Sequence, residues 1–184
     1  GVVSTASYEA RRYGVHSAMP SSTAHRLCPD AIWVRGNHSR YKEMSDKVMR
    51  ILNDETPFMQ QVSIDEAFLH LDGIDPEAVP QMCRELVSKI RKWVGVPVSI
   101  GVAPTKTLAK IASHFAKKYK GYRGVCMMDT EEKRRKALEM TPIGDVWGIG
   151  RRLAPKMVEK GVHTAWDFAM RPREWVSRYY HVNG

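Results

Sequence analysis

The feature that most restricts the fold is a pair of adjacent acidic residues, Asp65 and Glu66, within the apolar segment 59–73. Apolar side chains flank the pair on both sides: Val62, Ile64, Phe68, Leu69 and Leu71. These flanks are short and rich in β-branched and aromatic residues, which favours strands over a helix. Strict alternation would bury one of the two carboxylates, so we expect the chain to turn or bulge at the pair.

Two carboxylates at the edge of a sheet are well suited to a hard cation. Mg²⁺ is usually bound by one or two carboxylates together with substrate phosphates. The alternative is a solvated strand end that binds nothing. The acidic pair by itself leaves both interpretations open.

Strands and amphipathic helices alternate along the rest of the chain. Apolar spacing predicts helices over 39–54, 79–94 and 105–118, and strands over 31–34, 96–102 and 125–128. With the acidic segment as the first strand, residues 59–128 read strand, helix, strand, helix, strand. This order is typical of a split βαβ sheet, so we predict an α+β fold with helices on one face of the sheet.

Composition leaves several kinds of partner open. The net charge is +9 and the pI is near 9.6, which suits a nucleic acid, an acidic protein or an anionic membrane surface. No apolar stretch has the length of a membrane span, and we expect no membrane partner. The three cysteines form no Cys-x-x-Cys pattern, which favours a reducing compartment such as the cytoplasm, with the thiols as core residues.

The helix expected over 105–118 has a basic side with no acid to compensate it. At 100° per residue, Lys106, Lys110 and Lys117 project within about 40° of one another. Residues 104–123 contain six Lys or Arg and no acidic residue. An ordinary exposed helix carries charges of mixed sign, so this pattern favours a polyanionic partner over a solvated basic face.

Residues 141–161 are predicted to form a helix-hairpin-helix, with two short helices meeting at Gly148-Ile149-Gly150. Glycines let another backbone approach closely, and free amides in the first turn of the second helix can bind a phosphate. Arg151 and Arg152 add positive charge there. Such contacts position DNA without reading its sequence. A purely structural helical hairpin is the alternative.

Five motifs, in the same order and over most of the chain, resemble those of the Y-family (translesion) DNA polymerases of the DinB and UmuC type. They are TASYEARRYGV (5–15), SAMP (17–20), SIDEAF (63–68), GVAPTKTLAK (101–110) and VWGIGR (146–151). The resemblance implies partial fingers over 1–37, a palm over 38–128, and a partial thumb with the helix-hairpin-helix over 129–184. The choice between the DinB and UmuC branches stays open.

The resemblance also implies roles for particular residues. The reaction would be nucleotidyl transfer from a dNTP to a primer 3′-hydroxyl, with two Mg²⁺ ions bound by palm carboxylates that match Asp65 and Glu66. The residues matching contacts to the dNTP phosphates are Thr5, Tyr8, Arg11 and Lys117. We assign contacts with primer-template DNA to Lys106, Lys110, Gly148, Gly150, Arg151 and Arg152.

One expected palm element has no counterpart in the sequence. Members of the family carry a first strand with Asp-x-Asp-x-Phe-Phe or a close variant, which supplies another metal-binding aspartate. We therefore expect an internal piece of a polymerase, without this strand and without the little finger, that binds Mg²⁺ weakly or not at all and is inactive by itself. The rival hypothesis is a non-catalytic DNA-binding module. A sliding-clamp partner through other regions is left open, and a bacterial cytoplasmic, DNA-associated location is expected.

Overall fold

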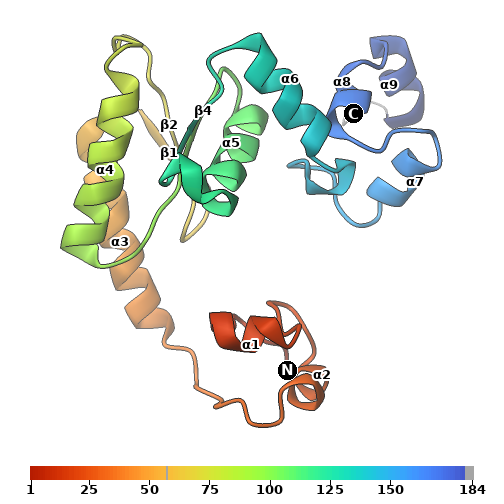
Figure 1. Cartoon of the computed structure of the whole chain (residues 1–184). Helices are drawn as coiled ribbons and strands as arrows, with labels where there is room; N and C mark the ends of the chain where they lie inside the picture. The colour runs from red at the N-terminus through yellow and green to blue at the C-terminus, as the bar shows by residue number, and fades with distance from the viewer. Residues whose placement is uncertain (57, 181–184) are drawn as a thin grey trace. The chain divides into compact units, whose positions relative to one another are not determined.

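The computed structural model describes residues 1–56 and 58–180, which divide into two compact units (Figure 1). The first unit is Gly1–Ser45, and the second comprises the residues from Asp46 onward. Each unit has its own buried apolar core. Helix α3 (His38–Glu55) spans the boundary between them.

The N-terminal unit packs two short helices, α1 (Tyr8–Arg12) and α2 (Ser21–Leu27), against an extended entry segment. The Ser7 hydroxyl caps α1 by accepting a hydrogen bond from the Ala10 amide at 3.2 Å. The entry segment is held by reciprocal backbone bonds with residues 18–19, each 2.8 Å long. The core of this unit is small and consists of Val3, Val15, Met19 and Ala24.

The prediction of a strand over 31–34 is wrong. These residues have no regular structure, and Ile32 and Val34 are 91% and 85% exposed. Their β-branched side chains favour extended backbone. A strand also needs a partner, and no described residue pairs with this segment.

The long helices of the second unit match the predictions. The end of α3 packs on α4 (Val79–Val94) through Ile51, Leu86 and Ile90, which lie at helical spacing and are buried. Gly95, in the left-handed conformation at φ 82°, ends α4. Burial raises the thiol pKa of Cys83 and Cys126, and the three cysteines are free thiols.

Strands pair in two separate ladders within the described residues. β1 (Met59–Gln61) and β2 (Ala67–Leu69) form an antiparallel hairpin with Gln60 opposite Phe68. β3 (Ile100–Val102) and β4 (Val125–Met127) are parallel, with Gly101 beside Cys126. The strand predicted from residue 96 is shorter than expected, because β4 offers partners to residues 100–102 only. The α+β class is confirmed, and β3, the intervening helix and β4 form the βαβ unit.

Helix α5 (Lys106–Lys118) crosses from β3 to β4 and packs directly on β3. The Thr105 hydroxyl caps it by accepting from the Leu108 amide. Gly101 permits this contact. A Cβ atom built on Gly101 would lie 2.1 Å from the Ser113 nitrogen and 2.2 Å from the Ala109 carbonyl oxygen. No side chain fits in that space.

The chain then turns through η1 (Lys120–Tyr122) and β4 into a series of short helices. They are α6 (Glu131–Met140), η2 (Ile143–Asp145), α7 (Ala154–Val158), α8 (Ala165–Ala169) and α9 (Arg173–Tyr180). One apolar core runs from α5 through α6 to α8. None of the helices in the described residues is both long and apolar enough to span a bilayer.

A capping box starts α8 and makes a testable contribution to stability. The Asp167 carboxylate accepts hydrogen bonds of 2.9 Å from the Thr164 and His163 amides, which hold the pKa of Asp167 below its usual value. Because the folded-state pKa is lowered, this stabilisation is present above the unfolded pKa and is lost as the pH falls below it. We expect Asp167→Asn to cost about 0.5–1 kcal/mol at pH 7.

Urea unfolding of wild type and Asp167→Asn from about pH 7 to about pH 3 checks this pH dependence, because that range includes the usual Asp pKa. The difference between the two proteins should shrink as the pH falls. A difference that does not change with pH would contradict a role for the charged carboxylate.

Candidate active site and nucleic-acid contacts

The acidic pair lies in the loop of the β1–β2 hairpin. The loop is closed by hydrogen bonds from the Val62 and Ser63 amides to the Glu66 carbonyl, at 2.9 and 3.2 Å. Asp65 and Glu66 are both exposed. The expectation that the chain turns at the pair is confirmed, since a turn lets both carboxylates avoid the core.

The two carboxylates are held in different ways. The Ser63 hydroxyl donates to Asp65 Oδ1 at 2.7 Å, a local contact within the loop. Glu66 receives the Lys110 ammonium from α5, with Nζ at 2.7 and 2.8 Å from its two carboxylate oxygens. The hairpin loop is thus tied to the basic side of α5 by an ion pair between residues far apart in the sequence.

Two aromatic rings adjoin this ion pair. The Trp147 and Phe68 rings have centroids 5.5 Å apart, and Lys110 Nζ lies 5.6 Å from the centre of the Trp147 ring. Lys106 Nζ lies 5.4 Å from the Phe68 ring and also bonds to Gln60. Sequence reasoning gave Trp147 and Phe68 no role. Each lies in one of the quoted motifs, but nothing in the sequence indicates that they meet.

The residues present fit a magnesium ion in part. Asp65 and Glu66 offer exposed, hard oxygen ligands of the type that Mg²⁺ takes together with phosphates. No third His, Cys, Asp or Glu gathers with them in the part of the chain that the structure describes. Two carboxylates can serve one Mg²⁺ ion that keeps water or phosphate ligands, but they do not form an all-protein cage.

The three lysines of the predicted basic stripe have different surroundings. Lys106 and Lys110 contact the β1–β2 hairpin, whereas Lys117, in the last turn of α5, is exposed. The side chain of Lys117 makes no hydrogen bond, ion pair or ring contact with any described residue. That lysines 106 and 110 contact DNA, and Lys117 a triphosphate, stays a prediction.

The other candidates for phosphate binding lie in the N-terminal unit. Tyr8 and Arg11 are one turn apart on α1, and the Arg11 guanidinium lies 5.3 Å from the Tyr8 ring centre. Arg11 Nε donates to the Ala6 carbonyl at 3.0 Å, which leaves its terminal nitrogens available. Tyr8 is 74% exposed and Thr5 is exposed. The N-terminal unit therefore presents two hydroxyls and a guanidinium to solvent.

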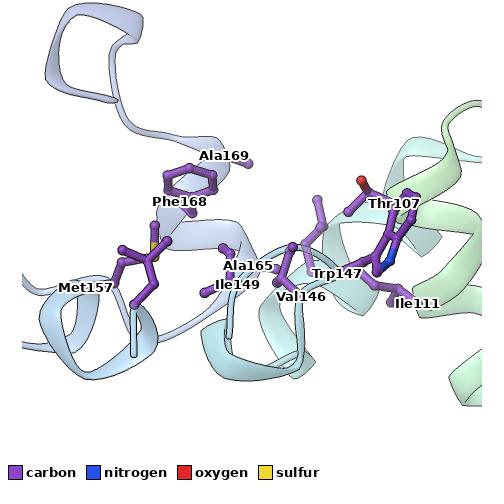
Figure 2. A pocket seen from close by; sticks show the side chains of 12 residues that line it. Thr107, Ile111, Val146, Trp147, Ile149, Met157, Ala165, Phe168 and Ala169 are labelled. Atoms are coloured by element: carbon purple, nitrogen blue, oxygen red, sulfur yellow. The ribbon is translucent and has the colours of Figure 1, made fainter. Parts of the chain in front are cut away.

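A cavity of about 310 Å³ lies between α5 and the short C-terminal helices. Figure 2 shows Thr107 and Ile111 of α5 beside Trp147 on one side, with Met157 and Phe168 on the other. The lining is mostly apolar. Trp147 therefore has apolar space next to it as well as its contacts with Phe68 and Lys110.

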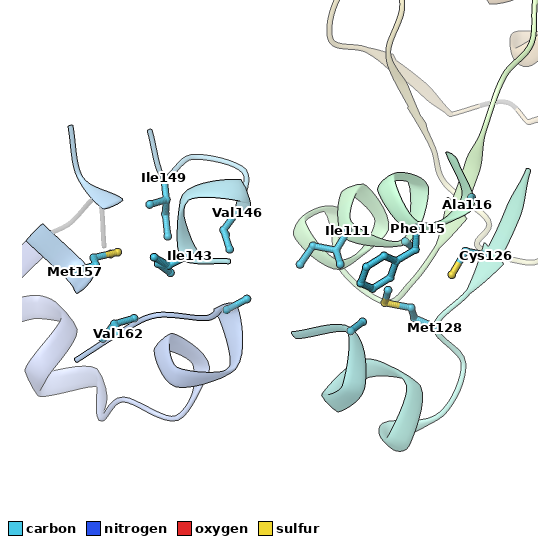
Figure 3. Packing of buried hydrophobic residues seen from close by; sticks show 13 residues of the cluster. Ile111, Phe115, Ala116, Cys126, Met128, Ile143, Val146, Ile149, Met157 and Val162 are labelled. Atoms are coloured by element: carbon cyan, nitrogen blue, oxygen red, sulfur yellow. The ribbon is translucent and has the colours of Figure 1, made fainter. Parts of the chain in front are cut away.

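The predicted helix-hairpin-helix is less helical than expected. Its first part is a single 3₁₀ turn, η2, and the helix after the glycines does not begin until Ala154. Beneath it lie buried apolar residues, seen in Figure 3: Ile143, Val146, Ile149, Met157 and Val162. The amides of Gly150, Arg151 and Arg152 donate to no described carbonyl. Both arginines are exposed.

The two glycines of this turn differ in what the fold requires. Gly148 has φ +92°, a backbone conformation that side chains disfavour. Gly150 has neither a positive φ nor any atom within 4 Å of a built Cβ. Packing in this chain therefore does not explain a glycine at position 150.

Comparison with known proteins agrees with the fold and the motifs. Residues 1–114 match the model of the impB/mucB/samB family. DNA polymerase IV of Dehalococcoides mccartyi is 37% identical over 178 residues, which are 96% of this chain and 44% of that protein. DNA polymerase IV of Treponema denticola is 41% identical over 164 residues, which are 88% of this chain and 40% of that protein.

Solved structures agree as well. An insertion ternary complex of Dbh DNA polymerase superimposes with a TM-score of 0.81 and 30% identity, covering 97% of this chain and 51% of that one. DinB from Sulfolobus solfataricus gives a TM-score of 0.81 and 30% identity, with 99% and 53% covered.

The resemblance to the Y-family DNA polymerases is thereby confirmed. The chain belongs to the impB/mucB/samB family. It spans 40–44% of the length of the two bacterial relatives described above.

Proposed function

We propose that this chain supplies parts of the fingers (1–37), of the palm (38–128) and of the thumb (129–184) of a template-directed translesion DNA polymerase. The reaction is nucleotidyl transfer from a dNTP to a primer 3′-hydroxyl. Family membership and the relatives named DNA polymerase IV support the reaction class. The observation that carries the proposal is the exposed acidic pair in the hairpin loop, beside the basic side of α5.

Asp65 and Glu66 are the residues that would hold Mg²⁺. When bound there, Mg²⁺ supplies charge stabilisation to the transferring phosphate and lowers the pKa of the attacking hydroxyl. The described residues provide two carboxylates and no third ligand nearby. We therefore expect the 184-residue chain by itself to bind the metal weakly and to extend no primer.

Phosphate binding is divided among several side chains. Tyr8 and Arg11, stacked on α1, would bind phosphate oxygens of the incoming nucleotide, and Thr5 would add a hydroxyl. A guanidinium suits this role because its planar fork donates two parallel hydrogen bonds. Lys117 would add a point charge from the palm, since its ammonium has no described partner.

DNA would be bound by the helix-hairpin-helix over 141–161 and by α5. The free amides of Gly150, Arg151 and Arg152, and the two arginine side chains, are donors suited to backbone phosphates. Gly148 shapes the turn, and the open space at Gly150 leaves room for a nucleic-acid backbone. Lys106 and Lys110 would add charge on the palm. We propose that the protein acts on DNA in the bacterial cytoplasm.

DNA binding by the 184-residue chain should be independent of sequence and strongly dependent on salt. Each neutralised phosphate releases counterions, so four such contacts imply about a hundredfold loss of affinity between roughly 50 and 200 mM salt. Fluorescence anisotropy with two unrelated duplexes at several salt concentrations measures this. An affinity that ignores salt, or a strong preference for one duplex, would contradict the phosphate contacts.

Gly150 offers a sharper test of the same surface. Gly150→Ala should leave the free energy of unfolding within about 0.5 kcal/mol of wild type, since the added Cβ meets no atom. It should weaken DNA binding several-fold if the duplex backbone occupies that space. Gly36→Ala is the matched control, because its Cβ makes only ordinary contacts with Tyr41 and lies outside the helix-hairpin-helix. Equal affinities for all three proteins would remove Gly150 from the interface.

The second candidate function is a non-catalytic DNA-binding module. The observation in its favour is the ion pair between Lys110 and Glu66. In a binding module this ion pair would be structural, and the acidic residues would bind no metal. The two functions differ in primer extension by the complete gene product. A polymerase extends a primer with the nucleotide that the template specifies, and a binding module does not.

A further inference from the structure

The Lys110–Glu66 ion pair joins the acidic loop to a tryptophan outside it. Lys110 Nζ contacts both oxygens of Glu66 at 2.7 and 2.8 Å and lies 5.6 Å from the centre of the Trp147 ring. The side chains of Lys110 and Glu66 are 28% and 48% exposed, so the pair is only partly screened by water. The Lys110 ammonium therefore occupies the position at which a metal ion would bind Glu66.

We propose that Lys110 is the resident counter-ion of Glu66, that it must leave this carboxylate before a divalent cation can bind there, and that Trp147 retains the released ammonium. This inference rests on the proposed function, in which Asp65 and Glu66 bind the metal. It assigns Lys110 and Trp147 as positioning residues that control the affinity of the acidic pair for cations.

Two electrostatic effects of Lys110 both weaken the binding of a metal ion to Glu66. Its ammonium competes for the oxygens of Glu66, and its charge repels a second cation brought close to it. Removing that charge should therefore tighten metal binding. For a partly exposed ion pair the change should be about two- to tenfold in affinity.

Trp147 gives Lys110 an alternative partner. The face of an indole ring attracts an ammonium, so Lys110 can leave Glu66 without losing all of its favourable contacts. Trp147 also touches Phe68 of β2, and the apolar cavity beside it gives the ring space to shift. Trp147 directly precedes Gly148 in the helix-hairpin-helix that we propose binds DNA. Binding of a cation to Glu66 would therefore change the surroundings of that DNA-binding segment. By linkage, DNA bound there would in turn change the cation affinity.

Metal binding by Lys110 variants tests the proposal directly. Free Mn²⁺ is measured by electron paramagnetic resonance during titration of the 184-residue chain. Lys110→Gln should bind Mn²⁺ about two- to tenfold more tightly than wild type. Lys110→Arg, which keeps the charge, should bind as weakly as wild type. Lys92→Gln removes the same charge from an exposed site on α4 and should change the affinity less than about twofold.

Tryptophan fluorescence during titration with MgCl₂ supplies the second readout. Wild type should show a change that is absent from Trp147→Phe and from Glu66→Gln. Circular dichroism confirms that each variant is folded.

The outcomes separate this inference from the function on which it rests. If Asp65→Asn leaves Mn²⁺ binding unchanged, the acidic pair is not the metal site and the proposed function loses its metal. If binding depends on Asp65 but Lys110→Gln binds no more tightly than wild type, only the role of Lys110 is overturned. Failure of every variant to bind Mn²⁺, including Lys110→Gln, also overturns it. A Mg²⁺-dependent fluorescence change that persists in Trp147→Phe overturns the role of Trp147.

Discussion

Replacing Asp65 by asparagine in the complete gene product is expected to reduce the rate of primer extension by at least about a thousandfold. Asparagine keeps the size of the side chain and removes the negative charge that would bind Mg²⁺. Loss of one preorganised donor to a transition state already costs about a hundred- to a thousandfold in rate, and loss of a metal ligand should cost at least as much. Glu66→Gln should have an effect of the same order.

Asp72→Asn is the matched control for this substitution. Asp72 lies a few residues further along the same segment, and its side chain is 95% exposed. The change in charge is identical, so extension by Asp72→Asn should stay near the wild-type rate. Single-turnover kinetics with a labelled primer measures all three variants. A rate for Asp65→Asn within about tenfold of wild type would exclude its carboxylate from the chemistry.

Gly101→Ala should be the most destabilising small substitution in the described part of the second unit. The new Cβ atom would lie 2.1 Å from the Ser113 nitrogen and 2.2 Å from the Ala109 carbonyl oxygen, so β3 and α5 must separate. Both obstacles are backbone atoms of a helix and cannot rotate away. Overpacking of this kind costs about 3 kcal/mol or more, a large share of the 5–15 kcal/mol typical of a domain.

Urea unfolding followed by circular dichroism measures this cost. The control is Gly121→Ala, because Gly121 has no positive φ and its Cβ would meet no atom within 4 Å. This control should match wild type or be slightly more stable, since alanine restricts the unfolded chain. A loss below about 1 kcal/mol for Gly101→Ala would show that α5 does not pack on β3 as described.

Much of the fold could be predicted because its helices are strongly periodic. The helix expected over 79–94 has those bounds, and the helix expected over 105–118 runs from Lys106 to Lys118. Their apolar faces are the ones that are buried. The acidic loop was predictable for a different reason: two adjacent carboxylates can both avoid a core only where the strand turns.

The remaining features depend on contacts that local sequence does not encode. Residues 31–34 have strand propensity and no partner strand among the described residues, so propensity alone misled. Helical spacing placed Lys106 and Lys110 on one side of α5 but could not say that this side meets the β1–β2 hairpin. The contact of Lys110 with Glu66 joins residues 44 apart, and only the folded chain brings them together.

A template-directed polymerase whose chemistry depends on the acidic pair must copy each template base and must lose this activity when the pair is changed. Primer extension by the complete gene product measures both properties when Mg²⁺ and one dNTP at a time are supplied on four templates that differ at the first unpaired base. We expect incorporation of the complementary nucleotide on each template, and we expect Asp65→Asn to lose this incorporation while it retains DNA binding. Tight DNA binding without any Mg²⁺-dependent extension by the wild-type product would contradict this expectation and favour the binding module.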